Sequence, residues 1–227
     1  MERMAEAIEG SAYRRYPHFL SNSPWDHVSV IPHVAQETSA IFQEQRARQG
    51  TPTGDLIDES AHLQKGRASV GVSRQYAGVI GKVDHGQVGG YASLCNDTPA
   101  PLLNERLFLP ECGADDPERC QPADLPPAER VHASKPHQAL AMIAENLAQG
   151  IQWDGIGGDG LYGHSAELPK GLDARALFYV LDVHQDELIY TAKPELAVPP
   201  RTPARGPPPT KLRADRDPIR LEQYCQA

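Results

Sequence analysis

The chain has 227 residues, of which 40% are hydrophobic, and it carries a formal net charge of −8. This length suits one sizeable core, or one core with a small helical unit beside it. The negative charge argues against a surface that binds nucleic acid everywhere, because phosphate contacts need Lys and Arg. The apolar runs are too short for a signal peptide or a membrane span, so we expect a cytoplasmic protein.

The cysteines predict neither a disulfide framework nor a metal site. Cys95, Cys112, Cys120 and Cys225 form no CxxC pair, and the histidines that follow Cys120 do not complete a usual zinc spacing. Reduced thiols are the simpler interpretation.

Residues 1–54 are predicted to form a helical N-terminal region. Apolar residues recur at helical spacing over 13–20 and again over 34–42. Ser23 and Pro24 suit the start of the second helix, because Ser caps a helix and Pro fits its first position.

Residues 55–192 are predicted to form the main domain, which begins with three strands at 56–58, 68–73 and 83–94. The turns between these strands are short, so the three should form an antiparallel meander. The next part is rich in loops, with one short strand over 104–110.

A helix and two strands complete this domain. The helix is predicted to begin at Pro136 and to end at Gly150. A strand over 153–158 follows the helix. The continuous apolar run over 176–181 predicts a fifth strand that is buried on both faces.

The order of these elements suits an α/β fold with a ribonuclease-H-like mixed sheet, in which three antiparallel strands precede parallel ones. In that arrangement the first and fourth strands are parallel neighbours. Residues 193–227 are proline-rich and basic and lack apolar periodicity, so we expect a disordered tail.

Two aspartates that each close a short apolar run are the candidate site. Asp58 follows Leu56-Ile57, and Asp159 follows Gly157-Gly158. A single Asp after a strand is most often a turn former or a helix cap. In the predicted fold, however, the two aspartates lie side by side at one edge of the sheet, where two carboxylates can hold Mg²⁺.

The residues around both aspartates resemble the catalytic motifs of insertion-sequence transposases of the DDE superfamily. The segment from Ile57 to Gly66, with its Asp-Glu pair and its Lys-Gly, is similar to the first motif. Gly158-Asp159-Gly160-Leu161-Tyr162-Gly163 is similar to the second. The segments 69–83, 104–110 and Lys135-Pro136 continue the resemblance in the same order, so that it runs from Tyr13 to Lys211.

The resemblance implies an enzyme that cuts DNA at the ends of an insertion sequence and joins them to target DNA. Mg²⁺ or Mn²⁺ would be the cofactor, with Asp58 bridging two ions and Asp159 binding one. The ions would activate the attacking oxygen and stabilise the leaving oxygen. Lys65, Arg74 and Lys82 would contact DNA phosphates, although solvated surface cations are an equally good interpretation.

Three residues beside the aspartates are given structural roles. Side chains alternate along a strand, so Glu59 should point away from Asp58. Tyr162 and His164 are expected to serve in packing or in a turn rather than in chemistry.

Three features depart from the family pattern. The family's third carboxylate, a Glu on a helix beyond the fifth strand, has no counterpart at Glu187, Glu195 or Glu222. The chain ends at Ala227, before such a helix, and Pro169 interrupts the segment after the second aspartate. We therefore expect a truncated and inactive transposase that lacks the third acidic ligand.

Two alternatives stay open. One is a complete ribonuclease-H-like nuclease whose third ligand is not recognised. The other is a non-catalytic remnant that binds DNA or the full-length transposase and modulates that enzyme through mixed oligomers. In each case the expected partners are DNA, a second copy of the chain or the full-length transposase, and none is a membrane.

Overall fold

The structure is a computed structural model, and it describes residues 15–23, 27–66, 68–96, 100–114, 116–123, 125–200 and 210–226. The expectations for residues 1–14, for Pro24 and for the proline-rich stretch 201–209 lie outside the described residues.

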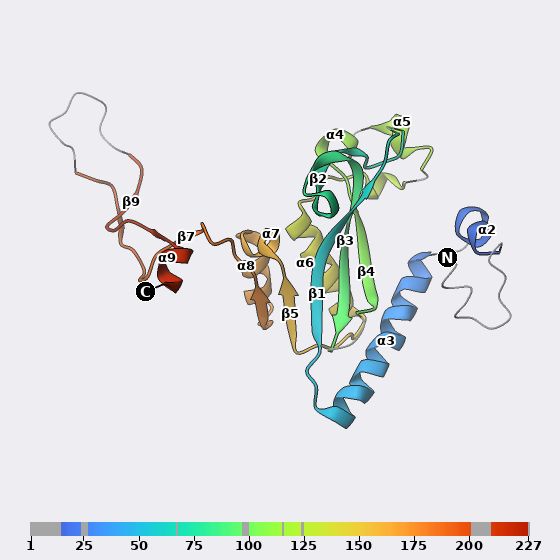
Figure 1. Cartoon of the computed structure of the whole chain (residues 1–227), viewed down its shortest axis with the longest axis horizontal. Helices are drawn as coiled ribbons and strands as arrows, with labels where there is room; N and C mark the ends of the chain where they lie inside the picture. Colours follow the sequence, from blue (N-terminus) through green and yellow to red (C-terminus); the bar gives the residue numbers. More distant parts are fainter. Residues whose placement is uncertain are drawn as a thin grey trace.

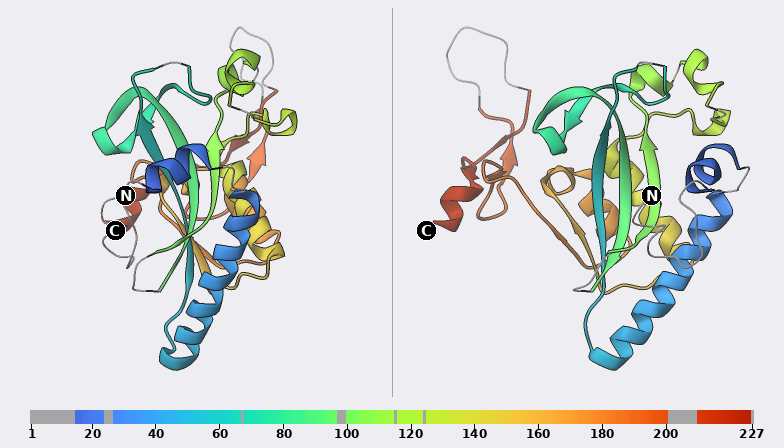
Figure 2. Two further views of the ribbon diagram at one scale, coloured as in Figure 1. Left: turned by 90° about the vertical axis from the view of Figure 1, so that its right-hand side faces the viewer. Right: turned by 45° about the vertical axis from the view of Figure 1, so that its right-hand side comes forward.

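Two helices occupy the described part of the N-terminal region: α2 (Arg15–Asn22) and α3 (His27–Gln49). The long helix α3 lies alongside the edge of the central sheet (Figure 2). Its buried residues Ala35 and Phe42 belong to the same core cluster as the sheet residues. The predicted helical stripe over 34–42 faces the core only in part, because Val34 and Ile41 are exposed.

A six-stranded mixed sheet lies at the centre of the described structure (Figure 1). Its strands are β1 (Gly54–Leu63), β2 (Ser73–Ala77), β3 (Lys82–Cys95), β4 (Leu102–Phe108), β5 (Gly155–Gly158) and β6 (Tyr179–Leu181). Strand β3 pairs antiparallel with β1, β2 and β4, whereas β1, β5 and β6 run parallel to one another. The sheet confirms the predicted mixed α/β class and is compatible with a ribonuclease-H-like arrangement.

The second strand begins later than predicted. Residues 68–72 form a connection that crosses β3, and the Val70 carbonyl accepts a hydrogen bond from the Gln87 side chain at 2.7 Å. Gly71 has a φ of 74°, which an extended strand does not allow. The alternation of small and apolar residues over 68–73 therefore belongs to a loop, and β2 starts at Ser73.

The fifth predicted strand is not buried on both faces. Strand β6 lies at the edge of the sheet, and among the described strands it pairs with β5 alone. Tyr179 and Leu181 pack against the core, but Phe178 is 70% exposed and Val180 is 64% exposed. The prediction was wrong because an apolar run does not reveal whether both faces of its strand are covered.

Helix α6 (Lys135–Ala148) covers one face of the sheet. Ser134 caps it, since the Ser134 hydroxyl accepts a hydrogen bond from the His137 amide at 3.2 Å. Ala139, Met142 and Ile143 are buried on its inner side. The predicted helix is confirmed, but of its predicted apolar stripe Ile143 is buried whereas Leu147 is exposed.

The short helices near the second aspartate are α7 (Gly160–Gly163) and α8 (Glu167–Asp173). Pro169 does not break α8, because it lies in the first turn, where backbone amides have no partner within the helix. Leu168 and Leu172 of α8 are fully buried. The segment after the second aspartate is thus helical despite its proline.

Short elements complete the described chain. They are η1 (Gly78–Ile80), α4 (Glu111–Ala114), α5 (Pro117–Cys120), η2 (Pro127–Glu129), β7 (Leu188–Ile189), β8 (Leu196–Ala197), β9 (Arg213–Ala214), β10 (Ile219–Arg220) and α9 (Leu221–Cys225).

The C-terminal segment extends away from the central sheet (Figure 1). It holds two small antiparallel pairs, β7 with β10 and β8 with β9, followed by α9. Leu188, Leu196, Leu212 and Tyr224 are exposed there. The proposed domain boundaries and the disorder of 193–227 stay predictions. No helix in the described ranges is long and apolar enough to cross a bilayer.

Candidate functional site

The two aspartates lie side by side because β1 and β5 are parallel neighbours. The register pairs Ile57 with Gly158, so the next residue along each chain is an aspartate. Asp58 does not end its strand, since β1 continues to Leu63 in its pairing with β3. Strand β5 does end here, and Asp159 begins the turn into α7.

Both aspartates belong to the same exposed face of the sheet. A Cβ atom on Gly157 would lie 2.6 Å from the Leu56 side chain, which shows that positions 56 and 157 share one face. Side chains alternate along a strand, so Asp58 and Asp159 share that face too. Partial burial raises the pKa of Asp58, and the neighbouring charge of Asp159 raises it further.

Each aspartate is held in place by a backbone amide. The Asp58 carboxylate accepts a hydrogen bond from the Glu59 amide at 2.7 Å, and the Asp159 carboxylate accepts one from the Leu161 amide at 3.0 Å. Asp159 is the N-cap of α7. A capping role and a metal-binding role are compatible, because one carboxylate has several lone pairs.

Glu59 points to the other face, as alternation predicts. Its carboxylate forms an ion pair with the Lys135 ammonium at 2.8 Å, and both side chains are less than one-fifth exposed. Tyr162 is buried beside this pair. Burial raises the pKa of Tyr162 most, and the charges of Glu59, Asp58 and Asp159 add to the increase. Lys135, Glu59 and Tyr162 therefore lie together on the core side of the sheet, next to the strand positions that carry the two aspartates.

Two residues that follow β6, Asp182 and His184, also reach this part of the molecule, and sequence reasoning missed them. His164 pairs with Glu187 at 2.6 Å, and its ring lies 6.3 Å from that of His184. The Asp182 amide donates a hydrogen bond to the Gly158 carbonyl at 2.9 Å, which places Asp182 at the same edge as Asp159. The strand order could have indicated this, because parallel strands end at the same edge.

The described residues do not form a metal site of three or more protein ligands. Within the described ranges, no group of three or more His, Cys, Asp or Glu side chains is arranged to hold an ion. The side chains of Asp58 and Asp159 are ligands of the type that Mg²⁺ and Mn²⁺ prefer, since both are exposed carboxylates on one face of the sheet. Glu187, whose carboxylate pairs with His164 at 2.6 Å, does not form such a group with the two aspartates.

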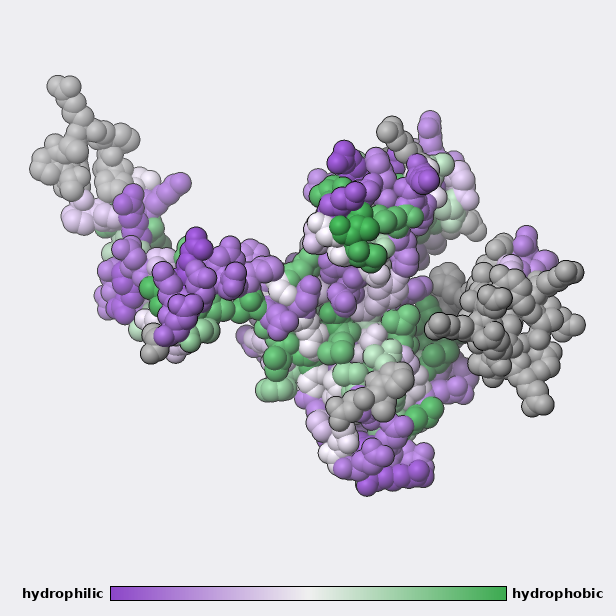
Figure 3. Space-filling model, in the orientation of Figure 1, coloured by the Kyte–Doolittle hydropathy of each residue, from purple (hydrophilic) through white to green (hydrophobic). Residues whose placement is uncertain are grey.

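The three predicted DNA-binding cations are all exposed, at the end of β1 and on the β2–β3 hairpin. The register pairs Arg74 with His85 and Ala77 with Lys82. Counting along β3 from Tyr91, the partner of Asp58, Arg74 shares the aspartates' face and Lys82 belongs to the other. Exposed Val79, Ile80 and Val83 form an apolar patch at the tip of this hairpin (Figure 3).

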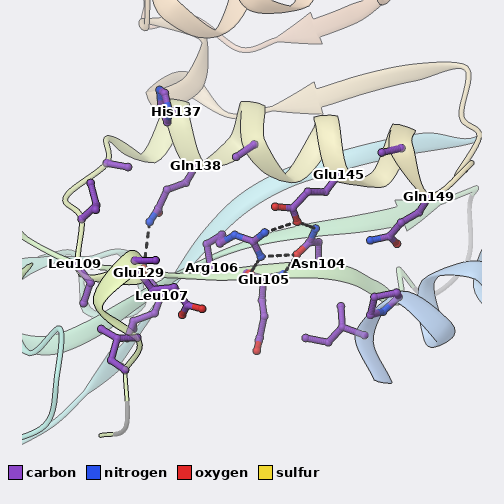
Figure 4. Close-up of a pocket in the computed structure, with 18 residues that line it drawn as sticks. Asn104, Glu105, Arg106, Leu107, Leu109, Glu129, His137, Gln138, Glu145 and Gln149 are labelled. Atoms are coloured by element: carbon purple, nitrogen blue, oxygen red, sulfur yellow. Dashed lines mark hydrogen bonds and ion pairs between the residues drawn. The ribbon is translucent and has the colours of Figure 1, made fainter. Parts of the chain in front are cut away.

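A hollow of about 920 Å³ lies elsewhere, between β4, α6 and the start of α3 (Figure 4). Its polar groups bind one another: Arg106 pairs with Glu145, and Asn104 donates to Glu145 at 3.0 Å. Gln138 donates to the Leu107 carbonyl at 3.1 Å, which protects the edge of β4 from a further strand. The residues predicted from the sequence as catalytic or DNA-binding are not part of this hollow.

Comparison with known proteins agrees with the motif resemblance. A family model described as "DDE superfamily endonuclease" matches residues 1–227, the whole chain. The chain belongs to this family.

The chain is 29% identical over 175 residues to the "Probable transposase for insertion sequence element IS701" of Microchaete diplosiphon. The matched part is 76% of the chain and 41% of that relative, so the chain spans less than half of the relative's length. No solved structure matches the chain.

Proposed function

We propose that the chain is the ribonuclease-H-like part of a DDE transposase, and that Asp58 and Asp159 hold the Mg²⁺ or Mn²⁺ ions of its DNA-cleaving site. One observation carries the proposal: the register of β1 and β5 brings the two motif aspartates together on one exposed face. The family membership of the chain supports the same assignment.

The chain's own residues would bind and orient the reactants. Asp58 and Asp159 would hold the ions, which supply activation of the attacking oxygen and stabilisation of the leaving oxygen. The amides of Glu59 and Leu161 fix the two carboxylates. Lys135 neutralises Glu59 beneath them, which limits the negative charge that an incoming phosphate meets.

Arg74 is the best placed of the three predicted DNA-binding cations, because the register assigns it to the aspartates' face. Lys65 and Lys82 would bind phosphates outside this face. All three remain proposals.

Two carboxylates leave the ions under-coordinated, so a third ligand from outside the described carboxylates is needed. Because charge develops on both the attacking and the leaving oxygen, loss of one acidic ligand should cost orders of magnitude in rate. We propose that the 227-residue chain binds Mg²⁺ or Mn²⁺ weakly and does not catalyse strand transfer by itself.

A cleavage assay tests this function. The substrate is DNA that carries the ends of the insertion sequence, with Mn²⁺ supplied. The chain alone should not cut it, and an in-frame fusion to the part of the IS701 relative that the match does not cover should restore cleavage that depends on Asp159.

Robust cleavage by the chain alone, lost in Asp159→Ala, would instead show a third ligand within the chain and support the alternative of a complete nuclease. A fusion that stays inactive but still binds the DNA would favour the non-catalytic remnant.

A further inference from the structure

A small hollow of about 170 Å³ lies on the same face of the sheet as the two aspartates. Residues that line it are His62 of β1, Gln87, Gly89 and Tyr91 of β3, and Glu105, Arg106 and Leu107 of β4. Arg106 is engaged in its ion pair with Glu145. Tyr91 is the register partner of Asp58, and Gly89 is the partner of Ser60. The hollow is therefore centred about 7 Å along β1 from Asp58, at about 3.4 Å per residue.

Tyr91 forms one wall of the hollow, and its position is fixed. A Cβ atom on Gly89 would lie 2.6 Å from the Tyr91 hydroxyl oxygen, so the ring lies across the backbone of Gly89, where only a glycine fits. The Tyr91 hydroxyl also forms a hydrogen bond with His62 Nε2 at 3.0 Å. The ring is thus a preformed aromatic surface beside the site.

Glu105 supplies a hydrogen-bond acceptor to the hollow, whereas Gln87 and His62 are already bonded to other groups. Gln87 already donates to the Val70 carbonyl and accepts from Gln64, and His62 is bonded to Tyr91. Glu105 is the register partner of Tyr91 and is exposed. Its carboxylate repels phosphate but accepts well from an amino group, as it does from the N4 amino group of cytosine.

The size of the hollow limits what it can hold. Pockets for drug-sized ligands measure roughly 300–1,000 Å³, so a hollow of about 170 Å³ has room for one planar ring only. An aromatic wall and a carboxylate acceptor together suit a single nucleobase with an exocyclic amino group.

We propose that this hollow, the Tyr91 pocket, binds one unpaired base of the DNA strand held at Asp58 and Asp159. Tyr91 stacks on the base, and Glu105 accepts a hydrogen bond from its exocyclic amino group. The pocket therefore prefers cytosine to thymine, which has no such group. The proposal rests on the DNA-cleaving function proposed above and adds a base preference to it.

Binding of fluorescent dC12 and dT12 oligonucleotides, measured by anisotropy in EDTA and low salt, tests this pocket. The wild-type chain should bind dC12 more tightly than dT12. Tyr91→Leu should weaken dC12 binding by about 5- to 150-fold, the range for loss of one base–aromatic stack. Tyr91→Phe keeps the ring and should bind dC12 like the wild type, as should Tyr224→Leu, which removes an exposed tyrosine from α9.

Glu105→Gln tests base recognition separately from any effect on the fold, because it changes the relative affinity for dC12 and dT12. Its amide can donate to the O4 atom of thymine, so dT12 should gain affinity relative to dC12. Equal binding of dC12 and dT12 by the wild type, or dC12 binding unchanged by Tyr91→Leu, overturns the proposal. Because EDTA removes the metal, failure of the metal site would not alter these results, so the two proposals fail separately.

Discussion

At the scale of single residues, the most unusual group is Asp55, which sequence reasoning did not single out. Its side chain is fully buried on β1, and one oxygen accepts a long hydrogen bond of 3.5 Å from Asn146. The other oxygen has no hydrogen-bond partner among the described residues. Burial raises the pKa of Asp55 from 3.8 to about 7. The fold therefore keeps an uncharged carboxyl group in its core at mildly acidic pH.

Asp55→Asn should change the pH dependence of stability. The unfolded chain releases this proton near its ordinary pKa, whereas the folded chain keeps it until about pH 7. Wild-type stability should therefore fall as pH rises between these values. Asn does not titrate, so the variant should gain about 3–4 kcal/mol relative to the wild type between about pH 4 and pH 7. Urea unfolding at several pH values measures this, and a pH-independent difference would show that Asp55 is not protonated in the fold.

The Lys135–Glu59 ion pair joins the start of α6 to the strand that carries Asp58. Both partners are less than one-fifth exposed, so removal of one leaves a poorly solvated charge. Lys135→Met should lower the free energy of unfolding by about 1–3 kcal/mol. This loss lies between those expected on breaking a surface ion pair and a buried ion pair.

Adding Glu59→Gln to Lys135→Met should restore part of that loss, because it removes the unpaired charge. Arg48→Met is the control: its partner Glu44 is also in α3, and both side chains are more than 60% exposed. That variant should change stability by less than about 0.5 kcal/mol. Equal losses in Lys135→Met and Arg48→Met would contradict the supporting role of the pair.

At the scale of elements, the turn after Asp159 is fixed by a close backbone contact. A Cβ atom on Gly163 would lie 1.8 Å from the carbonyl oxygen of Asp182, so α7 packs directly on the chain that leaves β6. Gly163→Ala should destabilise the fold by about 1–3 kcal/mol and lower the melting temperature by several degrees. Gly113→Ala, whose new methyl group would meet its nearest atom at 3.7 Å, should have a smaller effect. Similar melting temperatures for the two variants would mean that α7 is free to move away from β6.

Elements with a strong local pattern were predictable from the sequence. Strand β3, helix α6 with its proline near the start, and the short strand β5 all appear within a few residues of where they were expected. The loop at 68–72 and the exposed face of β6 were not predictable, because both depend on which strands become neighbours. Strand order is a property of tertiary contacts that a local pattern does not contain.

Only part of the candidate site was predictable from the sequence, again because tertiary contacts decide the rest. The two aspartates follow from local motifs and from strand order. Lys135 reaches Glu59 across 76 residues, and Asp55 meets Asn146 across 91. No spacing rule indicates such pairs, since they depend on how α6 lies across the sheet.

At the scale of the whole molecule, the chain combines a packed α/β core with two exposed carboxylates and a projecting C-terminal segment. It spans less than half of its IS701 relative. Asp58 and Asp159 are 101 residues apart in the sequence (159 minus 58). The parallel pairing of β1 and β5 in the core explains how their two motifs meet at one edge of the sheet. The proposed function therefore requires that these two carboxylates act as one site.

Calorimetric titration with Mn²⁺ tests this claim most directly, because it needs neither DNA nor catalysis. The wild-type chain should bind Mn²⁺ weakly, and Asp58→Asn and Asp159→Asn should each abolish binding while the melting temperature stays close to that of the wild type. Asp182→Asn, which changes a carboxylate at the same edge outside the proposed site, should bind Mn²⁺ like the wild type. Binding that survives either of the first two substitutions, or that is lost only in Asp182→Asn, would contradict a shared site at Asp58 and Asp159.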